Sequence, residues 1–226
     1  MKDNPEVPVR SVSKLFIVED HPIMRQGIHS LLSLHQDLVV CGEAGDAPSA
    51  LERIAAERPD LVILDLTLRG GSGLHLMKLL KFGWPNIKIL VLSAHEEPDY
   101  LERIFRSEAD GFLTKEESPD RLIEAVRQVL RGERYFCPKA KRYLRDREVG
   151  LPSNSETTSL DALTDRELEV LTYLGRGLGT VDTAHKLRIS VKTVETHRAN
   201  LKSKLGLKSA PELVRYAVNW IEREKR

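Results

Sequence analysis

Five short apolar runs in the first half of the chain limit its fold more than any other feature. The runs are rich in β-branched residues and, apart from Lys88, apolar on both faces, and they span residues 15–18, 38–41, 61–64, 87–92 and 111–113. Such runs are typical of strands covered on both faces of a parallel sheet. Because segments with helical spacing separate them, we predict an α/β fold with a doubly wound, five-stranded parallel sheet.

Helix starts support this alternation. Asp46 stands before Ala47 and Pro48, and Ser118 stands before Pro119, which is the order of an N-cap followed by proline in the first turn. Apolar side chains then recur at helical spacing, with one stripe at residues 51, 54 and 55 and another at residues 122, 123, 126 and 129.

The pattern changes after residue 131. Residues 132–147 are basic, with room for a short helix, and residues 151–159 are polar without periodicity. Thr164 with Glu167 and Ser209 with Glu212 form two capping-box patterns, and Ser190 caps a further helix. A chain of 226 residues exceeds what one small core usually organises. We therefore predict two domains, an α/β domain at 14–131 and a four-helix, all-α domain at 161–226, joined by a linker at 132–160.

Charge is unevenly distributed although the whole chain carries only +1. Residues 1–159 have a net charge of −3 and residues 160–226 of +4, and between Lys186 and Lys208 seven basic residues accompany one acid. Such a stretch suits phosphate contact, although a solvated helix face has the same composition. We find neither a membrane-spanning apolar run nor a signal-peptide core, so we expect a cytoplasmic protein without a membrane partner.

Polar side chains end four of the predicted strands. Glu19 and Asp20 follow the first strand, Asp65 the third, Ser93 the fourth and Lys115 the fifth. Doubly wound sheets place their site at these carboxyl ends. Three converging carboxylates repel one another unless a divalent cation such as Mg²⁺ neutralises them. A hydroxyl and an ammonium opposite could hold a transferred phosphoryl group, and Asp65 would then be the nucleophile.

Three other interpretations of these strand-end residues are solvent-facing groups, a phosphatase or mutase site, and a flavin-binding site. Taken singly, each of these residues is more often a solvent-facing group. A phosphatase or mutase needs a general acid two residues after the nucleophile, but that position holds Thr67. A flavin-binding protein needs a phosphate loop after the first strand, where this chain has the acidic pair Glu19 and Asp20. We therefore predict a binding and signalling protein rather than an enzyme.

Residues 14–131 resemble a response-regulator receiver domain. The segments that carry the resemblance are FIVEDHP at 16–22, PDLVILDL at 59–66, GGSGL at 70–74, VLSA at 91–94 and ADGFLTK at 109–115. The resemblance implies that a partner histidine kinase donates phosphate to Asp65. It also implies that Asp20 ligates Mg²⁺ directly, that Glu19 does so directly or through water, and that the backbone carbonyl of Thr67 completes the protein ligands.

The same resemblance assigns the switch. Ser93 and Lys115 would bind the phosphoryl oxygens, and Phe112 stands where the family keeps an aromatic side chain that moves with Ser93, although ordinary core packing explains Phe112 equally well. The chain departs from the family in two places. Glu19 replaces a common Asp, and Arg69 replaces a common proline, which loosens the loop and adds a cation near the pocket.

Residues 187–194 have the pattern of a helix, a tight turn, a serine cap and a second helix. On that second helix Val194, Leu201 and Leu205 fall on one face, which we assign to the core. The opposite face mixes a cation, a carboxylate, a hydroxyl and a methyl group, all of which can contact base edges in the major groove. On the pattern alone, an ordinary solvated amphipathic helix is the better interpretation.

Residues 160–220 are, however, similar to the LuxR-type DNA-binding domains of NarL/FixJ-type regulators. The matching segments include LTDRELEVL at 163–171, SVKTVETH at 190–197, KLG at 204–206 and ELV at 212–214. The DNA-contacting residues expected from this helix are Lys192, Thr193, Glu195, Thr196, Arg198, Ala199 and Lys202. Thr183 departs from the usual large aliphatic residue and Val181 from a usually polar one, so we expect a slightly weaker preceding helix.

These observations combine into one expected mechanism. Phosphorylation of Asp65 shifts the population of receiver states, and the chain then forms a homodimer and binds promoter DNA as a transcription factor. We expect the dimer contact on the helices near 22–34 and 119–131, with the region at 97–112 as the alternative. The outward residues proposed for that contact are Ile23, Gln26, Gly27, Arg127, Gln128 and Arg131.

Overall fold

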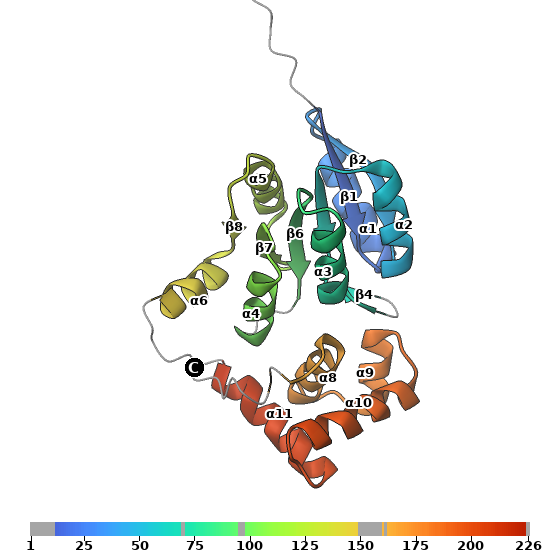
Figure 1. The fold of residues 1–226 in the computed structure, drawn as a ribbon, viewed down its shortest axis with the longest axis vertical. Coiled ribbons are helices and arrows are strands. Elements are labelled where there is room, and N and C mark those ends of the chain that lie inside the picture. Colours follow the sequence, from blue (N-terminus) through green and yellow to red (C-terminus); the bar gives the residue numbers. More distant parts are fainter. Residues whose placement is uncertain (1–11, 69–70, 95–97, 149–159, 161, 225–226) are drawn as a thin grey trace, which may run out of the picture.

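The computed structural model describes residues 12–68, 71–94, 98–148, 160 and 162–224. Its first half is built on a parallel sheet of six strands in the order β2-β1-β3-β6-β7-β8 (Figure 1). The strands are β1 Ser13–Val18, β2 Leu38–Ala44, β3 Leu61–Leu64, β6 Lys88–Ser93, β7 Gly111–Thr114 and β8 Tyr135–Phe136. A separate antiparallel pair, β4 Thr67–Leu68 and β5 Gly71–Ser72, follows β3.

Five helices cover the two faces of this sheet. They are α1 Pro22–Ser33, α2 Ala47–Glu57, α3 Gly73–Gly83, α4 Pro98–Arg106 and α5 Pro119–Leu130. Ile28 of α1 and Val126 of α5 share one core cluster with Ile17, whereas Ile54 of α2 and Met77 of α3 pack in the other cluster. Burial on both faces is the reason for the continuously apolar strands, and the doubly wound prediction is confirmed.

The sixth strand was not predicted. β8 pairs in parallel with β7, with Tyr135 opposite Gly111 and Phe136 opposite Phe112. Helix α6, Pro138–Glu148, follows it, so both elements fall inside the range that we predicted as a linker. The ring of Phe105 on α4 lies 4.9 Å from that of Phe136, and the Tyr143 hydroxyl of α6 donates to Glu102 at 2.9 Å. The segment after α5 therefore packs against α4 and the β7 edge.

Helix starts follow the sequence signals in part. The Asp46 side chain accepts a hydrogen bond from the Ser49 backbone at 2.9 Å, whereas Ser118 makes no side-chain cap bond. The stripe predicted for α2 was wrong at Ala55, which is exposed while Ala50 is buried.

The second half is helical, as predicted. It consists of α8 Asp165–Gly175, α9 Thr180–Leu187, α10 Val191–Lys204 and α11 Ala210–Glu224. Both hydrogen bonds of the capping box between Thr164 and Glu167 form, and Ser190 accepts from the Thr193 backbone at 3.0 Å. The second box is incomplete, because the Glu212 carboxylate accepts from the Lys208 backbone instead of from that of its cap residue.

The two halves pack together at the carboxyl ends of the strands. In Figure 1, α8 and α9 lie next to the sheet half and α10 lies beyond them. Arg103 of α4 joins the halves, since its Nη1 lies 2.8 Å from Asp165 Oδ1 and its Nη2 donates to the carbonyls of Leu160 and Leu163 at 2.9 Å. Within the described ranges, no helix has the length and apolar character needed to cross a bilayer.

Candidate functional site

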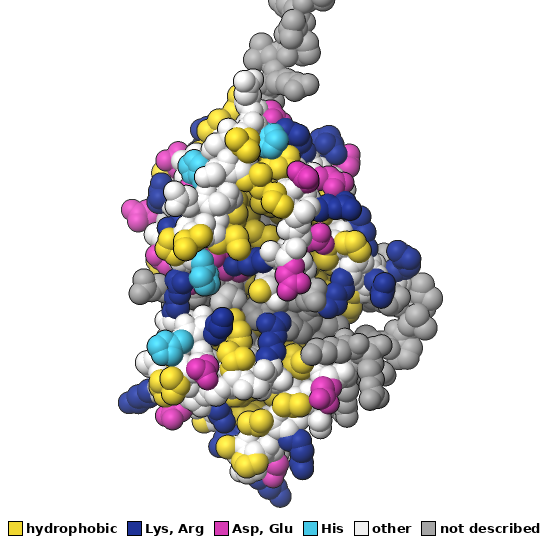
Figure 2. Space-filling model, turned by 180° about the vertical axis from the view of Figure 1, so that it is seen from behind, with side chains coloured by type: hydrophobic (Ala, Val, Ile, Leu, Met, Phe, Trp, Pro, Cys, Tyr) yellow, Lys and Arg dark blue, Asp and Glu magenta, His cyan; other side chains and the backbone are white. Residues whose placement is uncertain are grey.

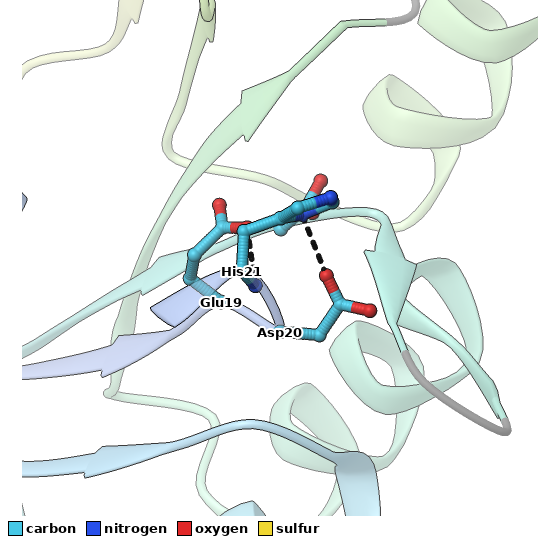
Figure 3. Close-up of side chains that lie close together, drawn as sticks. Glu19, Asp20 and His21 are labelled. Carbon is cyan, nitrogen blue, oxygen red and sulfur yellow. Dashed lines mark hydrogen bonds and ion pairs between the residues drawn. The ribbon is translucent and has the colours of Figure 1, made fainter. Parts of the chain in front are cut away.

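Three carboxylates meet in a buried pocket at the carboxyl edge of the sheet, and Figure 3 shows two of them, Glu19 and Asp20, beside His21. Glu19 and Asp20 follow β1, and Asp65 follows the neighbouring strand β3, where its backbone N–H donates to the Val18 carbonyl at 2.9 Å. All three side chains are almost fully buried. Ligand atoms of these residues and of His21 lie within 4.8 Å of one another.

Close packing at the start of α3 and a backbone hydrogen bond hold Asp65 in position. A Cβ atom on Gly73 would lie 2.2 Å from the Asp65 carbonyl oxygen, so only glycine fits where α3 begins. The Asp65 carboxylate in turn accepts from the Thr67 backbone N–H at 3.1 Å. The strand end and the following turn therefore hold the Asp65 side chain in place.

Two cationic side chains, Lys115 and Arg188, and the imidazole of His21 face the carboxylates. Lys115 Nζ lies 2.7 Å from Glu19 Oε2 and 2.8 Å from Asp65 Oδ2. His21 Nδ1 lies 2.8 Å from Asp20 Oδ1 and 3.1 Å from Glu19 Oε1, as the dashed lines of Figure 3 mark. Arg188, which belongs to the helical half, places its Nη1 3.1 Å from Asp20 Oδ2.

Burial dominates the proton affinities in this pocket. Desolvation raises the pKa of Asp65 to about 7, although Lys115 opposes the rise. Desolvation likewise raises the pKa of Asp20, with Arg188 acting in the opposite direction. Burial by itself would lower the pKa of Lys115, but Asp65 and Glu19 favour its charged form and leave that pKa above its usual value. Burial therefore disfavours the ionised forms of Asp65 and Asp20, and the neighbouring cations offset only part of that effect.

The donor atoms fit a hard divalent cation. Glu19 Oε2 and Asp20 Oδ1 are buried and accept no well-aligned hydrogen bond among the described residues, even though Lys115 Nζ lies 2.7 Å from the first and His21 Nδ1 lies 2.8 Å from the second. Buried carboxylate oxygens with free lone pairs are the ligands that such a cation prefers. The acidic cluster predicted from the strand ends is thus present.

The remaining predicted receiver residues also lie near this edge. Ser93 is fully buried at the end of β6, and its carbonyl accepts from the Lys115 backbone at 2.9 Å. Phe112 is fully buried in β7 beside Val91 of β6. Arg69 lies outside the described residues.

The predicted DNA-contacting face of α10 is largely open to solvent. Lys192, Thr193, Glu195, Thr196 and Ala199 are exposed and Lys202 is half-buried, whereas Val194 and Leu201 are buried in the core. Arg198 differs from its neighbours. It is half-buried, and its Nη1 donates to the Thr180 hydroxyl of α9 at 2.8 Å.

Two residues of the pocket were missed by the sequence analysis. His21 adjoins the acidic pair, so its position in the motif was the signal that could have found it. Arg188 has no such signal, because it lies 168 residues from Asp20 in the chain and meets it only through the packing of the two halves.

Comparison with known proteins covers both halves. The family model "Response regulator receiver domain" matches residues 15–127, and the model "Bacterial regulatory proteins, luxR family" matches residues 161–217. The oxygen regulatory protein NreC of Staphylococcus carnosus is 37% identical over 209 residues, which cover 91% of this chain and 96% of that protein. NreC of Staphylococcus aureus is 34% identical over the same shares of the two chains.

Solved structures agree with these matches. The response regulator RcsB of Salmonella typhimurium superposes with a TM-score of 0.64 at 25% identity, covering 92% of this chain and 98% of that one. RcsB of Salmonella enterica serovar Typhimurium bound to promoter rprA, in the presence of phosphomimetic BeF3-, gives a TM-score of 0.61 at 25% identity and covers 91% and 98% of the two chains.

Proposed function

Because this chain belongs to the response regulators that join a receiver domain to a LuxR-type DNA-binding domain, which are transcription regulators rather than enzymes, we propose that a phosphoryl group on Asp65 controls its binding to promoter DNA. The receiver domain is assigned to 14–131, the linker to 132–160 and the DNA-binding domain to 161–226. β8 and α6 extend the receiver's packing into the linker range. Promoter DNA as a partner implies a cytoplasmic protein.

The buried position of Asp65 between Glu19 and Lys115 carries the proposal. A carboxylate oxygen of Asp65 attacks the phosphorus of a phosphohistidine on a partner histidine kinase. The bond from phosphorus to the imidazole nitrogen breaks, the imidazole leaves, and an acyl phosphate forms. Lys115, 2.8 Å from Asp65 Oδ2, stabilises negative charge beside the reacting oxygen.

The pocket would hold Mg²⁺ through Glu19, Asp20, Asp65 and the backbone carbonyl of Thr67. When bound, the ion supplies the positive charge that the carboxylates and the phosphoryl oxygens require. Ser93 and Lys115 would bind phosphoryl oxygens, and Phe112, packed beside Val91 on the strand that ends at Ser93, would move with that serine.

Promoter contacts are assigned to the exposed face of α10. Its first turns present Lys192, Thr193, Glu195 and Thr196, and Ala199 follows on the same helix. The N-terminal part of such a helix enters the major groove in helix-turn-helix proteins. Lys202 suits a phosphate contact, and Arg198 must exchange its bond with Thr180 to reach DNA.

We place the homodimer contact on α1 and α5. The rival surface on α4 and β7 is already used by the chain itself, since β8 pairs with the β7 edge and α6 packs on α4. The α1 and α5 surface has an apolar groove lined by Met24, Ile28, Leu31 and Leu122, and Ile23 beside it is 88% exposed. Figure 2 shows hydrophobic side chains gathered on the back of the receiver half.

The other candidates for this contact include Arg127 on α5. Its guanidinium binds the Asp37 carboxylate at 2.9 and 3.0 Å within one chain. Reversing the charge of Arg127 would therefore disturb the monomer as well as a dimer, so the apolar residue Ile23 is the better probe.

Intact mass measurement tests the phosphoacceptor. The wild-type chain, incubated with Mg²⁺ and a small phosphodonor, gains the mass of one phosphoryl group, and the Asp65→Asn variant gains none because its nucleophile is gone. Asp60→Asn is the matched control, since it removes an exposed carboxylate at the opposite end of β3. A phosphoryl group on Asp65→Asn, or none on the wild type, would rule out the assignment.

A further inference from the structure

Arg188 reaches from the DNA-binding half into the acidic pocket of the receiver. It lies between α9 and α10, in the turn of the helix-turn-helix. Its Nη1 donates to the Asp20 backbone carbonyl at 2.8 Å and lies 3.1 Å from Asp20 Oδ2. His21 Nδ1 lies 2.8 Å from the other oxygen of that carboxylate, so a side-chain nitrogen lies beside each Asp20 oxygen and the guanidinium of Arg188 is the one with a permanent charge.

The backbone of Arg188 is unusual for an arginine. It is left-handed, with φ 51° and ψ 45°, and it caps the end of α9. Glycine and asparagine adopt this conformation at less cost than residues with long side chains. An arginine in this turn is thus locally unfavourable.

Other contacts hold the DNA-binding half in the same place. Lys78 of α3 lies 3.1 Å from Asp165 Oδ2, and Arg103 of α4 binds Asp165 and two carbonyls beside it. Arg176 at the end of α8 donates to the Ala94 carbonyl, just after β6, at 3.4 Å. α8 and α9 therefore lie over the carboxyl ends of the strands, where Asp65 is 2% exposed.

Helix α10, the recognition helix of the predicted helix-turn-helix, is not covered by the receiver in this arrangement. Five of the predicted DNA-contacting residues are exposed, namely Lys192, Thr193, Glu195, Thr196 and Ala199, and Figure 1 shows α10 on the far side of α8 and α9 from the receiver. Docking of the two halves thus encloses the phosphoacceptor and leaves the DNA-reading face accessible. The docked contact consequently acts on the acidic pocket and not on the DNA-reading helix.

We propose that Arg188 is an internal counter-ion of the acidic pocket, which neutralises the Asp20 carboxylate from its Oδ2 side, so that docking of the DNA-binding half and cation loading oppose each other. The inference rests on the proposed function, since it concerns the same pocket. A cation brought next to Asp20 meets the like charge of the guanidinium and displaces it. By linkage, the factor by which docking weakens cation binding is the factor by which the cation weakens docking.

Calorimetric titration of the full chain with Mg²⁺ alone tests this. Arg188→Asn removes the cation and suits the left-handed backbone, so the turn keeps its fold. We expect Arg188→Asn to bind Mg²⁺ more tightly than the wild type by on the order of fivefold or more. Arg188→Lys retains the charge and should stay near the wild type. Lys186→Ala removes an exposed cation of α9 and is the matched control.

Small-angle scattering gives a second readout. The radius of gyration of the wild type should increase when Mg²⁺ and beryllofluoride fill the pocket, and Arg188→Asn should already be larger without them. Equal Mg²⁺ affinities for the wild type, Arg188→Asn and Lys186→Ala would overturn the role of Arg188. If those affinities are equal while the wild type still accepts a phosphoryl group on Asp65, this inference fails and the proposed function stands.

Discussion

Glu169 on α8 is a single buried acid that makes the stability of the folded chain depend on pH. Its side chain has no solvent exposure, one carboxylate oxygen is held by Arg166, and the other accepts no hydrogen bond among the described residues. Burial raises the pKa of Glu169 to about 7, against the opposing charge of Arg166. The folded chain therefore keeps this proton over a pH range in which the unfolded chain has released it.

This retained proton predicts a pH-dependent stability. Between about pH 5 and 7 the folded state binds more protons than the unfolded state, so the free energy of unfolding falls as pH rises. Glu169→Gln mimics the protonated acid. It should match the wild type at pH 5 and exceed it by about 2 to 3 kcal/mol at pH 8. Urea unfolding at both pH values measures this, and a constant difference between the proteins at the two pH values would contradict it.

Thr183 is a second residue whose polar group lacks compensation. It is fully buried in α9, and its hydroxyl has no hydrogen-bond partner among the described residues. This agrees with the expectation that threonine weakens this helix at a position usually filled by an aliphatic side chain. Val181, the other departure in α9, is 55% exposed and has no such cost.

Thr183→Val should therefore stabilise the chain. Valine has nearly the same shape and removes the unpaired hydroxyl, so we expect the free energy of unfolding to rise by about 1 kcal/mol. Thr180→Val is an instructive comparison, because the Thr180 hydroxyl accepts a bond from Arg198 and its loss should not stabilise. Urea denaturation midpoints decide the matter, and a lower midpoint for Thr183→Val would refute this account of α9.

At the level of elements, sequence patterns predicted the long, buried segments and missed the short ones. Strands β1, β3 and β6 were found because burial on both faces leaves their central residues apolar. β8 has two residues, too few for any period, and it exists because the chain after α5 returns to the β7 edge. The sequence at Ser209 and Glu212 matches a capping box, but the Glu212 carboxylate accepts a hydrogen bond from the Lys208 backbone N–H instead of from that of Ser209.

The recognition helix α10 carries a prediction of its own. Ala199→Lys and Glu195→Ala alter exposed groups on the face assigned to base edges, so each should change which sequences are preferred. Lys202→Ala should weaken binding to all sequences similarly and lower the salt dependence, as loss of a phosphate contact does. Selection from randomised duplexes measures both effects. If all three variants weakened binding to every duplex equally, the assignment of base contacts to α10 would be wrong.

For the whole molecule, the sequence predicted which residues share the pocket but not how the two halves pack. The carboxyl ends of neighbouring parallel strands meet in any doubly wound sheet, so Asp20 and Asp65 follow from topology. The contacts of Arg188 and Arg103 depend on how the two halves of the chain pack together, and no local pattern encodes that packing. For this reason the counter-ion beside Asp20 is visible only in the structure.

The dimer surface is also a property of the whole molecule. Ile23 on α1 and Phe82 on α3 are equally exposed apolar side chains, at 88% and 89%, on helices that cover opposite faces of the sheet. Ile23→Glu should abolish phosphorylation-dependent dimerisation in sedimentation, because a charge cannot be buried without cost in the apolar contact. Phe82→Glu should leave it intact. The reverse result would move the contact to the α3 face.

Phosphorylation of Asp65 is proposed to control the affinity of the chain for DNA. Fluorescence anisotropy on a duplex obtained by selection measures that affinity directly. Affinity is compared before and after treatment with Mg²⁺ and a small phosphodonor, with the phosphorylated fraction followed by intact mass. We predict that the wild-type chain binds the duplex more tightly after treatment, and that Asp65→Asn binds equally before and after. Unchanged affinity of a fully phosphorylated wild type, or the same gain in Asp65→Asn, would show that a phosphoryl group on Asp65 does not control DNA binding.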